Sequence, residues 1–126
     1  MAVVNPDIFR QYDIRGVAKR DLTPATVELL GKAFGTYIQG HGSTEVIVGR
    51  DNRVSSERLR DDLVRGLMDT GCKVIDIGEV VTPIVYYARM HFNVDGAIMI
   101  TGSHNPPDEN GFKISRGDGT IHGEEI

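Results

Sequence analysis

The sequence predicts a three-layer α/β/α sandwich built on a mixed, mostly parallel sheet of about four strands, with one antiparallel edge strand. The first reason is that helical and strand-like segments alternate along the chain with short connections, which favours parallel strands with helices on both faces. The second reason is size. The chain has 126 residues, 40% of them hydrophobic and 25% charged, which suffices for one core of ordinary domain size. We therefore expect one globular domain over residues 1–126.

The first expected helix begins at Pro24. Thr23 is a favourable N-cap residue, and proline suits the first helical position. Gly40 or Gly42 is expected to end the helix. Between them, apolar residues recur at helical spacing, at Val27, Leu30, Phe34 and Ile38. The β-branched run of residues 45–48 then predicts a short buried strand.

The second expected helix is capped by Ser55 or Ser56 and stops at Gly71. One face of it is apolar and carries Leu59, Leu63 and Leu67. Residues 72–77 follow at once and are rich in β-branched side chains, so they predict the next strand.

The third expected helix opens at Thr82 and Pro83 and runs to about residue 91. Residues 96–100 form a further apolar strand. Asn110-Gly111 is a strong hairpin-turn signal. We therefore expect residues 112–115 to pair antiparallel at an edge of the sheet.

Charge and composition exclude several classes of function. The formal net charge is −4, which argues against nonspecific nucleic-acid binding because the usual excess of basic residues is missing. No apolar run approaches the roughly 20 residues that span a bilayer, and the first residues lack the pattern of a secretory signal. A single cysteine, Cys72, leaves no internal disulfide or thiolate metal cluster. We expect a cytoplasmic protein with no nucleic-acid or membrane partner.

The stretch TGSHNPPDENGFKI, residues 101–114, concentrates reactive and rigidifying residues directly after the expected strand 96–100. In open α/β sheets the functional crevice lies beyond the carboxyl ends of the parallel strands. Residues 50–53, which include two arginines, leave the strand 45–48 in the same direction. The two loops should therefore converge on one site.

The loop is expected to be rigid and to present Ser103. It contains two prolines, while Gly102 and Gly111 allow φ values that other residues avoid. A nucleophilic serine needs a base, but the neighbouring side chain of His104 points away in an extended segment. The G-x-S-x-G pattern of a nucleophile elbow is also absent. A serine hydrolase is thus disfavoured, and on loop chemistry alone an ordinary turn serine remains an alternative.

Cations suggest that Ser103 carries a phosphoryl group. A phosphoserine carries roughly −1.5 to −2 charges at neutral pH. That charge needs neutralisation by arginine, lysine or a divalent metal. Although the chain is acidic overall, cations gather in expected loops and at the ends of elements: Arg10, Arg15, Lys19, Arg20, Arg50, Arg53, Lys113 and Arg116.

Four segments resemble the first domain of the α-D-phosphohexomutases, most closely that of the bacterial phosphomannomutase/phosphoglucomutase group. They are FRQYDIRG at 9–16, VGRDNRVSS at 48–56, TPIVYYA at 82–88 and TGSHNPPDENGFKI at 101–114. The order is that of the family, and T-G-S-H-N-P-P is highly specific. Phosphoglucosamine mutases look similar but usually have a different N-terminal motif and an alanine where Gly102 stands, so they remain the nearest alternative.

The resemblance implies an isomerase that interconverts hexose 1-phosphate and hexose 6-phosphate. A phosphoserine passes its phosphoryl group to a mannose or glucose phosphate, and the resulting hexose 1,6-bisphosphate reorients and returns its other phosphate. The resemblance also implies Mg²⁺, held by the phosphoserine and by aspartates of a second domain outside this chain, and an activator such as glucose 1,6-bisphosphate. The chain would be domain I alone, separated from its downstream domains II to IV and inactive by itself.

The resemblance assigns roles by position. Ser103 is the phosphoserine and the metal ligand through its phosphate oxygen, and Asn105 braces the loop. Arg15 and Lys113 match the cations that contact the phosphate and the reacting sugar oxygen, and Lys113 is in addition a candidate general acid or base. The implied catalytic residues are Ser103, Lys113, Arg15 and His104, and the implied substrate-binding residues are Tyr12, Arg53 and Asn105.

Plainer alternatives stay open. Outside the motif, His104 is an ordinary hydrogen-bonding loop residue, and Lys113 alternates with apolar neighbours like a solvent-facing strand lysine. A noncatalytic phosphosugar-binding or regulatory module could also keep this fold. The retained Ser103, Lys113 and Arg15 favour the enzyme, because a binding module need not keep the serine that transfers phosphate.

Overall fold

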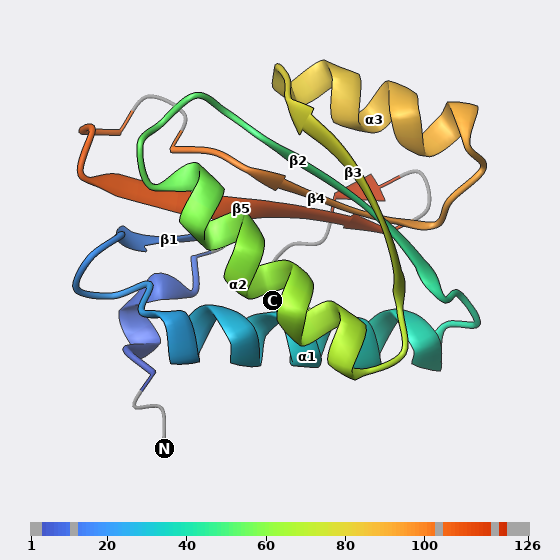
Figure 1. Ribbon diagram of the computed structural model, residues 1–126, viewed down its shortest axis with the longest axis horizontal. Coiled ribbons are helices and arrows are strands. Elements are labelled where there is room, and N and C mark those ends of the chain that lie inside the picture. Colours follow the sequence, from blue (N-terminus) through green and yellow to red (C-terminus); the bar gives the residue numbers. More distant parts are fainter. Residues whose placement is uncertain (1–3, 11–12, 103–104, 117–118, 121–126) are drawn as a thin grey trace.

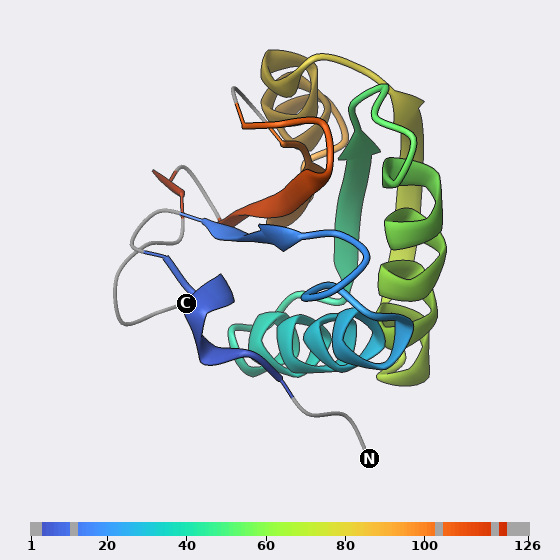
Figure 2. The same cartoon turned by 90° about the vertical axis from the view of Figure 1, so that its left-hand side faces the viewer.

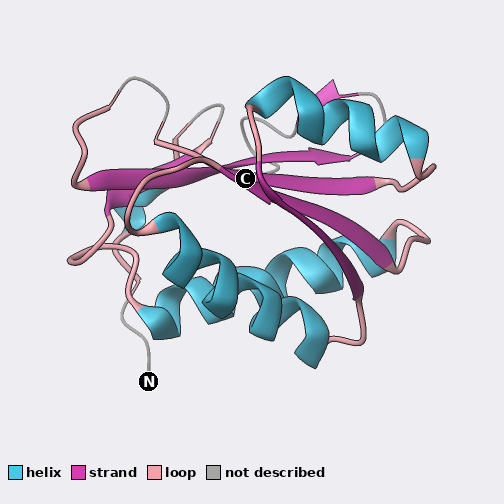
Figure 3. Cartoon of the chain, turned by 45° about the horizontal axis from the view of Figure 1, so that its top comes forward, coloured by secondary structure: helices cyan, strands magenta, loops and turns pink. Residues whose placement is uncertain are grey.

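The computed structural model describes residues 4–10, 13–102, 105–116 and 119–120. In chain order the elements are η1 (Pro6–Ile8), β1 (Ile14–Val17), α1 (Pro24–Gly40), β2 (Glu45–Arg50), α2 (Ser56–Asp69), β3 (Lys73–Glu79), α3 (Thr82–His91), β4 (Gly96–Ile100), β5 (Glu109–Arg116) and β6 (Gly119–Thr120). Helices α1 and α2 cover one face of the sheet and α3 covers the other (Figure 1). Figure 2 and Figure 3 show the same three layers from two other directions. The predicted α/β/α sandwich is confirmed.

The sheet differs from the prediction in the number of its strands and in the position of the antiparallel strand. Its order is β1-β5-β4-β2-β3, and the two-residue β6 pairs with β5. Strand β2 is parallel to β3 and β4, whereas β5 is antiparallel to β1, β4 and β6. The antiparallel strand expected at the edge therefore lies inside the sheet. The prediction missed β1, which covers that strand and forms the edge itself.

Asn110 and Gly111 do not form the turn that was predicted, because both lie within β5 and pair with β1. The Asn110 amide is fully buried and donates to the hydroxyls of Ser55 and Ser56, at 2.9 Å each. A Cβ atom on Gly111 would lie 2.1 Å from the carbonyl oxygen of Ile14. Glycine is thus needed for the close approach of two strands, and its φ is not positive.

The helices begin and end close to the predicted residues. The Thr23 side chain caps α1 by accepting from the Thr26 amide at 3.3 Å. Gly71 follows α2 with a φ of 91°, the left-handed conformation that favours glycine after a helix. Ser55 is the N-cap of α2 by position but makes no side-chain capping bond. Its hydroxyl accepts from Asn110 instead.

Strands β2 and β4 are buried on both faces because helices cover both. Along β2, Val46 and Val48 pack toward α1 and α2, whereas Ile47 packs toward α3. The first cluster includes Val27, Phe34, Ile38, Leu59, Leu63 and Leu67 from the two helices. The second includes Val85 and Ala88 from α3. This burial explains why the central residues of β2 and all of β4 form nearly continuous apolar runs in the sequence.

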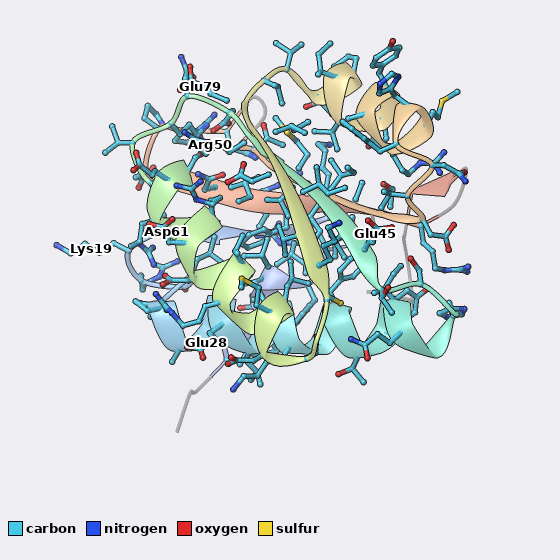
Figure 4. The ribbon with its side chains drawn as sticks, turned by 45° about the vertical axis from the view of Figure 1, so that its right-hand side comes forward. Lys19, Glu28, Glu45, Arg50, Asp61 and Glu79 are labelled. Carbon is cyan, nitrogen blue, oxygen red and sulfur yellow. The ribbon has the colours of Figure 1, made fainter. Side chains whose placement is uncertain are left out.

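Several charged side chains lie at the two ends of the parallel strands. Arg50 and Glu79 lie together at the carboxyl ends of β2 and β3, and Glu45 lies at the opposite end (Figure 4). In the part of the chain that the structure describes, no helix combines the length and apolar character that crossing a membrane requires.

Candidate functional site

Two loops meet at the carboxyl ends of β2 and β4, as the sequence predicts. The 51–55 loop leaves β2, and the 101–108 loop leaves β4 and returns as β5. Figure 1 shows both at the same end of the sheet. The connection after β1 joins them, because the Ala18 amide donates to the Asp108 carbonyl at 2.9 Å. This is the crevice position at which open α/β sheets bind ligands.

Arg53 holds the backbone of the 101–108 loop. Its Nη1 donates to the carbonyl oxygens of Pro106 at 2.6 Å and Glu109 at 3.1 Å, and its Nη2 donates to that of Asn105 at 2.8 Å. The guanidinium also lies against Gly102, where a Cβ atom would be 2.2 Å from Cζ of Arg53. These guanidinium contacts are with the loop itself, and the predicted substrate-binding role of Arg53 stays a prediction.

Asp51 holds the other end of the same loop. Its carboxylate accepts from the Gly102 amide at 3.0 Å, from the Arg53 amide at 3.1 Å and from the Ser56 hydroxyl at 2.5 Å. Burial raises the pKa of Asp51, but these hydrogen bonds and one from Thr101 outweigh it, so the pKa lies below its usual value. The carboxylate is therefore ionised at neutral pH.

Asn105 and Arg15 connect the loop to β1. The amide and the side-chain Nδ2 of Asn105 both donate to the Gly102 carbonyl at 2.9 Å, which ties these two loop residues together. Its Oδ1 accepts from Nη1 of Arg15 at 3.3 Å. Nη2 of Arg15 pairs with the buried Asp13 at 2.7 Å, and about a third of the arginine side chain, 32%, stays exposed. Asn105 thus braces the loop, and Arg15 is oriented beside it.

Lys113 lies on the same face of the sheet as Arg15. In the β4–β5 register Lys113 is opposite Met99, which packs toward α3. In the β1–β5 register Arg15 is opposite Gly111. Directly paired residues, and residues two apart in a strand, point to the same face. The two cations therefore flank Gly111 on the α3 face, and Lys113 is partly exposed.

A pocket of about 540 Å³ opens beside the 101–108 loop on this face. Its walls come from both sides of the site. They are formed by Asp51, Asn52, Arg53, Met99 and Thr101, and by residues 79–82 before and at the start of α3. The arrangement combines an open, partly polar pocket with nearby cations, which suits a phosphorylated ligand.

Three of the predicted site residues, Ser103, His104 and Tyr12, lie outside the described residues, so the geometry leaves their predicted roles untested. Sequence reasoning did not single out Asp51 or Asn110. Asp51 had a usable signal, because it directly follows a buried strand at its carboxyl end. Asn110 was interpreted only as a turn residue.

A metal site is not formed within the described ranges. Nowhere in them do three or more His, Cys, Asp or Glu side chains gather as metal ligands. Two carboxylates beside the loop are already engaged: Asp51 accepts from the Gly102 and Arg53 amides and from the Ser56 hydroxyl, and Asp13 pairs with Arg15. Neither fits the open carboxylate that Mg²⁺ requires.

The fold and the loop define a class of proteins. Residues 6–126 match the family described as phosphoglucomutase/phosphomannomutase, alpha/beta/alpha domain I. The chain therefore belongs to that family and corresponds to its domain I.

Individual relatives agree with this assignment. The chain is 47% identical over 119 residues to the phosphomannomutase/phosphoglucomutase of Pseudomonas aeruginosa, covering 94% of this chain and 26% of the relative. It is 47% identical over 109 residues to the phosphoglucomutase/phosphomannomutase of Thermococcus kodakarensis, covering 85% and 24%. A crystal structure of a family protein from Burkholderia thailandensis superposes with a TM-score of 0.92 at 38% identity, covering 98% of this chain and 29% of that one. The chain thus spans about a quarter of the length of these relatives.

Proposed function

We propose that this chain is the phosphoserine-bearing domain I of a phosphohexomutase, an isomerase that interconverts hexose 1-phosphates and hexose 6-phosphates of mannose and glucose. One observation carries the proposal: the loop that contains Ser103 is fixed at both ends, with Arg15 and Lys113 on one face of the sheet beside it. The names of its relatives support the substrate class. The reaction would need the downstream domains II to IV, so domain I alone is expected to be inactive.

Each half of the proposed reaction is a phosphoryl transfer. The bond between the Ser103 oxygen and phosphorus breaks, and a bond forms from phosphorus to the free hydroxyl of the hexose phosphate. That hydroxyl loses its proton as the new bond forms, and the serine oxygen gains one. After the bisphosphate reorients, the reverse transfer returns the other phosphoryl group to Ser103. Because phosphoryl transfer depends on positioning and on charge stabilisation, fixed cations supply much of the catalysis.

The cations of the site have separate proposed roles. Arg15 is held by Asp13 and Asn105, so its guanidinium would meet the phosphate with little loss of side-chain entropy. Lys113 would contact the reacting sugar oxygen and is our candidate carrier of the transferred proton. His104 would assist at the reacting group, and Tyr12 would contact the sugar.

Mg²⁺ would be held by a phosphate oxygen on Ser103 and by carboxylates outside this chain, since Asp51 and Asp13 are engaged. The ion, when bound, would neutralise charge on the phosphate. Glucose 1,6-bisphosphate is the proposed activator that restores a lost phosphoryl group. We place the protein in the cytoplasm, where hexose phosphates are available.

The test is phosphoryl transfer followed by mass spectrometry on the protein in its full natural length. Incubation with glucose 1,6-bisphosphate should add one phosphoryl group, about 80 Da, to Ser103. Addition of mannose 1-phosphate or glucose 1-phosphate should then remove it, and Ser103→Ala should abolish both steps. A protein that binds these sugar phosphates while Ser103 stays unmodified would be a noncatalytic binding module. Transfer only to glucosamine phosphates would assign it to the phosphoglucosamine mutases.

A further inference from the structure

We propose that the 51–55 loop is a clamp that sets the backbone of the 101–108 loop for phosphoryl transfer, with Arg53 as a positioning residue whose guanidinium serves the loop and does not bind the sugar. The proposal rests on the proposed function, because the group to be positioned is Ser103. It gives Arg53 a different role from the one that the family resemblance implies.

The clamp holds the loop on both sides of Ser103 and His104. On one side, the Gly102 amide donates to Asp51 at 3.0 Å. On the other side, Nη2 of Arg53 donates to the Asn105 carbonyl at 2.8 Å. Gly102 and Asn105 are the flanking residues in the sequence and also bond to each other.

The chemistry of arginine explains why this residue type is needed. A guanidinium has five N–H donors in a fixed planar fork and no acceptor, so it satisfies several carbonyl oxygens at once. Arg53 uses this fork on the carbonyls of Asn105, Pro106 and Glu109. Its charge is balanced by Asp51, whose carboxylate lies 3.4 Å from Nε. A lysine is a point charge on a flexible stem and does not reproduce three such bonds.

The buried side of the clamp is anchored to β5 and α2. The Ser56 hydroxyl donates to Asp51 and accepts from the Asn110 amide. Ser56 and Asn110 are both fully buried. The loop therefore rests on a hydrogen-bonded network whose inner members are shielded from water, where such bonds hold their geometry well.

Gly102 provides an independent signature of the clamp. Its φ is not positive, so the backbone there accepts a side chain. The obstacle is Arg53, since an added Cβ atom would lie 2.2 Å from both Cζ and Nε of the guanidinium. Glycine at 102 and arginine at 53 thus depend on each other, and a methyl group at 102 should harm the site through Arg53.

The first experiment measures how fast glucose 1,6-bisphosphate phosphorylates Ser103 in a single turnover of the full-length protein. Arg53→Ala should slow this transfer by about 100-fold, a loss that a misplacement near 1 Å can cause, and leave the KM for hexose phosphate within about threefold. Arg53→Lys should recover little of the loss. Arg60→Ala is the control, since Arg60 pairs with Asp61 and Asp76 on α2 and β3, away from the loop. A rise in KM with an unchanged transfer rate would overturn the proposal, because it would make Arg53 a substrate contact.

The second experiment is a double-mutant cycle with Gly102→Ala. In the wild-type background this substitution should slow transfer by about 100-fold, as for Arg53→Ala. In the Arg53→Ala background the space is empty, and adding Gly102→Ala should change the rate by less than about threefold, which is the non-additivity expected of contacting residues. Equal penalties in the two backgrounds would refute the dependence of Gly102 on Arg53.

Hydrogen exchange tests the clamp independently of the proposed reaction and of global unfolding. In Arg53→Ala the amides of Gly102 and Asn105 should exchange at least tenfold faster, while the amides of α1 keep their wild-type protection. If wild-type Ser103 takes no phosphoryl group, the proposed function fails, yet this exchange result still tests the clamp. Unchanged exchange at both amides would disprove the clamp whatever the enzyme does.

Discussion

Asp51 makes the stability of the protein depend on pH in a defined direction. Its folded-state pKa is lowered, since hydrogen bonds to the carboxylate outweigh the burial that raises it. A lowered pKa stabilises the fold above the unfolded value of about 3.9, and this stabilisation is lost as pH falls through the folded value. We expect Asp51→Asn to cost about 1–3 kcal/mol at pH 7, and less at pH 3.

Urea unfolding of both proteins at pH 7, 5 and 3 measures this difference. The matched control is Asp61→Asn, because the Asp61 carboxylate is mostly exposed and pairs with Arg60 on the surface. Its effect should stay within about 0.5 kcal/mol at every pH. A cost for Asp51→Asn that is the same at pH 3 as at pH 7 would contradict the role of the ionised carboxylate.

The sequence predicted that the two loops meet, but it did not single out all the residues that hold them together. The motif around Ser103 and the cations Arg15 and Lys113 were visible because their residue types and loop positions suit phosphate. Asn110 was not, because its partner Ser56 lies 54 residues away in the chain. Asp51 follows a buried strand, but its bond to the Gly102 amide joins residues 51 apart, which the sequence pattern does not show. The dipeptide Asn110-Gly111 by itself predicts a turn. In the fold both residues lie in β5, where the Asn110 side chain is buried.

At the scale of elements, α1 and α2 pack closely enough to exclude side chains at two glycines. A Cβ atom on Gly66 would lie 2.1 Å from the Glu28 carbonyl oxygen, and one on Gly31 would lie 2.4 Å from that of Leu63. Gly66→Ala should therefore force the helices apart and destabilise the fold by about 1–3 kcal/mol, as overpacking does. Denaturant unfolding measures the change.

Gly40→Ala is the control for that substitution. Gly40 is the last residue of α1, and a Cβ atom there would meet nothing within 4 Å. Alanine loses less backbone entropy on folding, so this variant should be neutral or more stable by about 0.5–1 kcal/mol. If both alanine variants had the same effect, helix propensity and not helix packing would govern Gly66.

Helices were easier to predict than strands for a physical reason. A cap, a proline and a 3.6-residue repeat are local signals. They predicted a start at Pro24 and an end at Gly40 or Gly42, and α1 runs over Pro24–Gly40. Strand β1 has only four residues, Ile14–Val17, and exists because β5 pairs with it. Its sequence, IRGV, contains a glycine and an arginine, so β-propensity does not mark it. The strand order likewise follows from long-range pairing that no short pattern encodes.

At the scale of the whole molecule, the two apolar clusters share the same central strands. Val46 and Val48 face one cluster and Ile47 faces the other, and β4 is divided in the same way. Loss of either helical layer would expose one face of β2 and β4 to water, at a cost that grows with the apolar area exposed. The layers should therefore stabilise each other and unfold together.

We accordingly expect one cooperative unfolding transition, which substitutions on either side of the sheet lower. Leu63→Ala, on the α1–α2 side, should cost about 2–5 kcal/mol. Val85→Ala, on the α3 side, should cost about 1–3 kcal/mol because fewer methyl groups are removed. Both side chains are almost fully buried, with 2% and 1% exposed.

Far-ultraviolet circular dichroism and tyrosine fluorescence measure the transition. Fluorescence reports on both helical layers, because Tyr37 lies on α1 while Tyr86 and Tyr87 lie on α3. The two signals should change at the same urea concentration in wild type and in both variants. If fluorescence changed first in Val85→Ala alone, α3 would be an independently unfolding layer, and the pocket that its first turn helps to line would open before the rest of the fold.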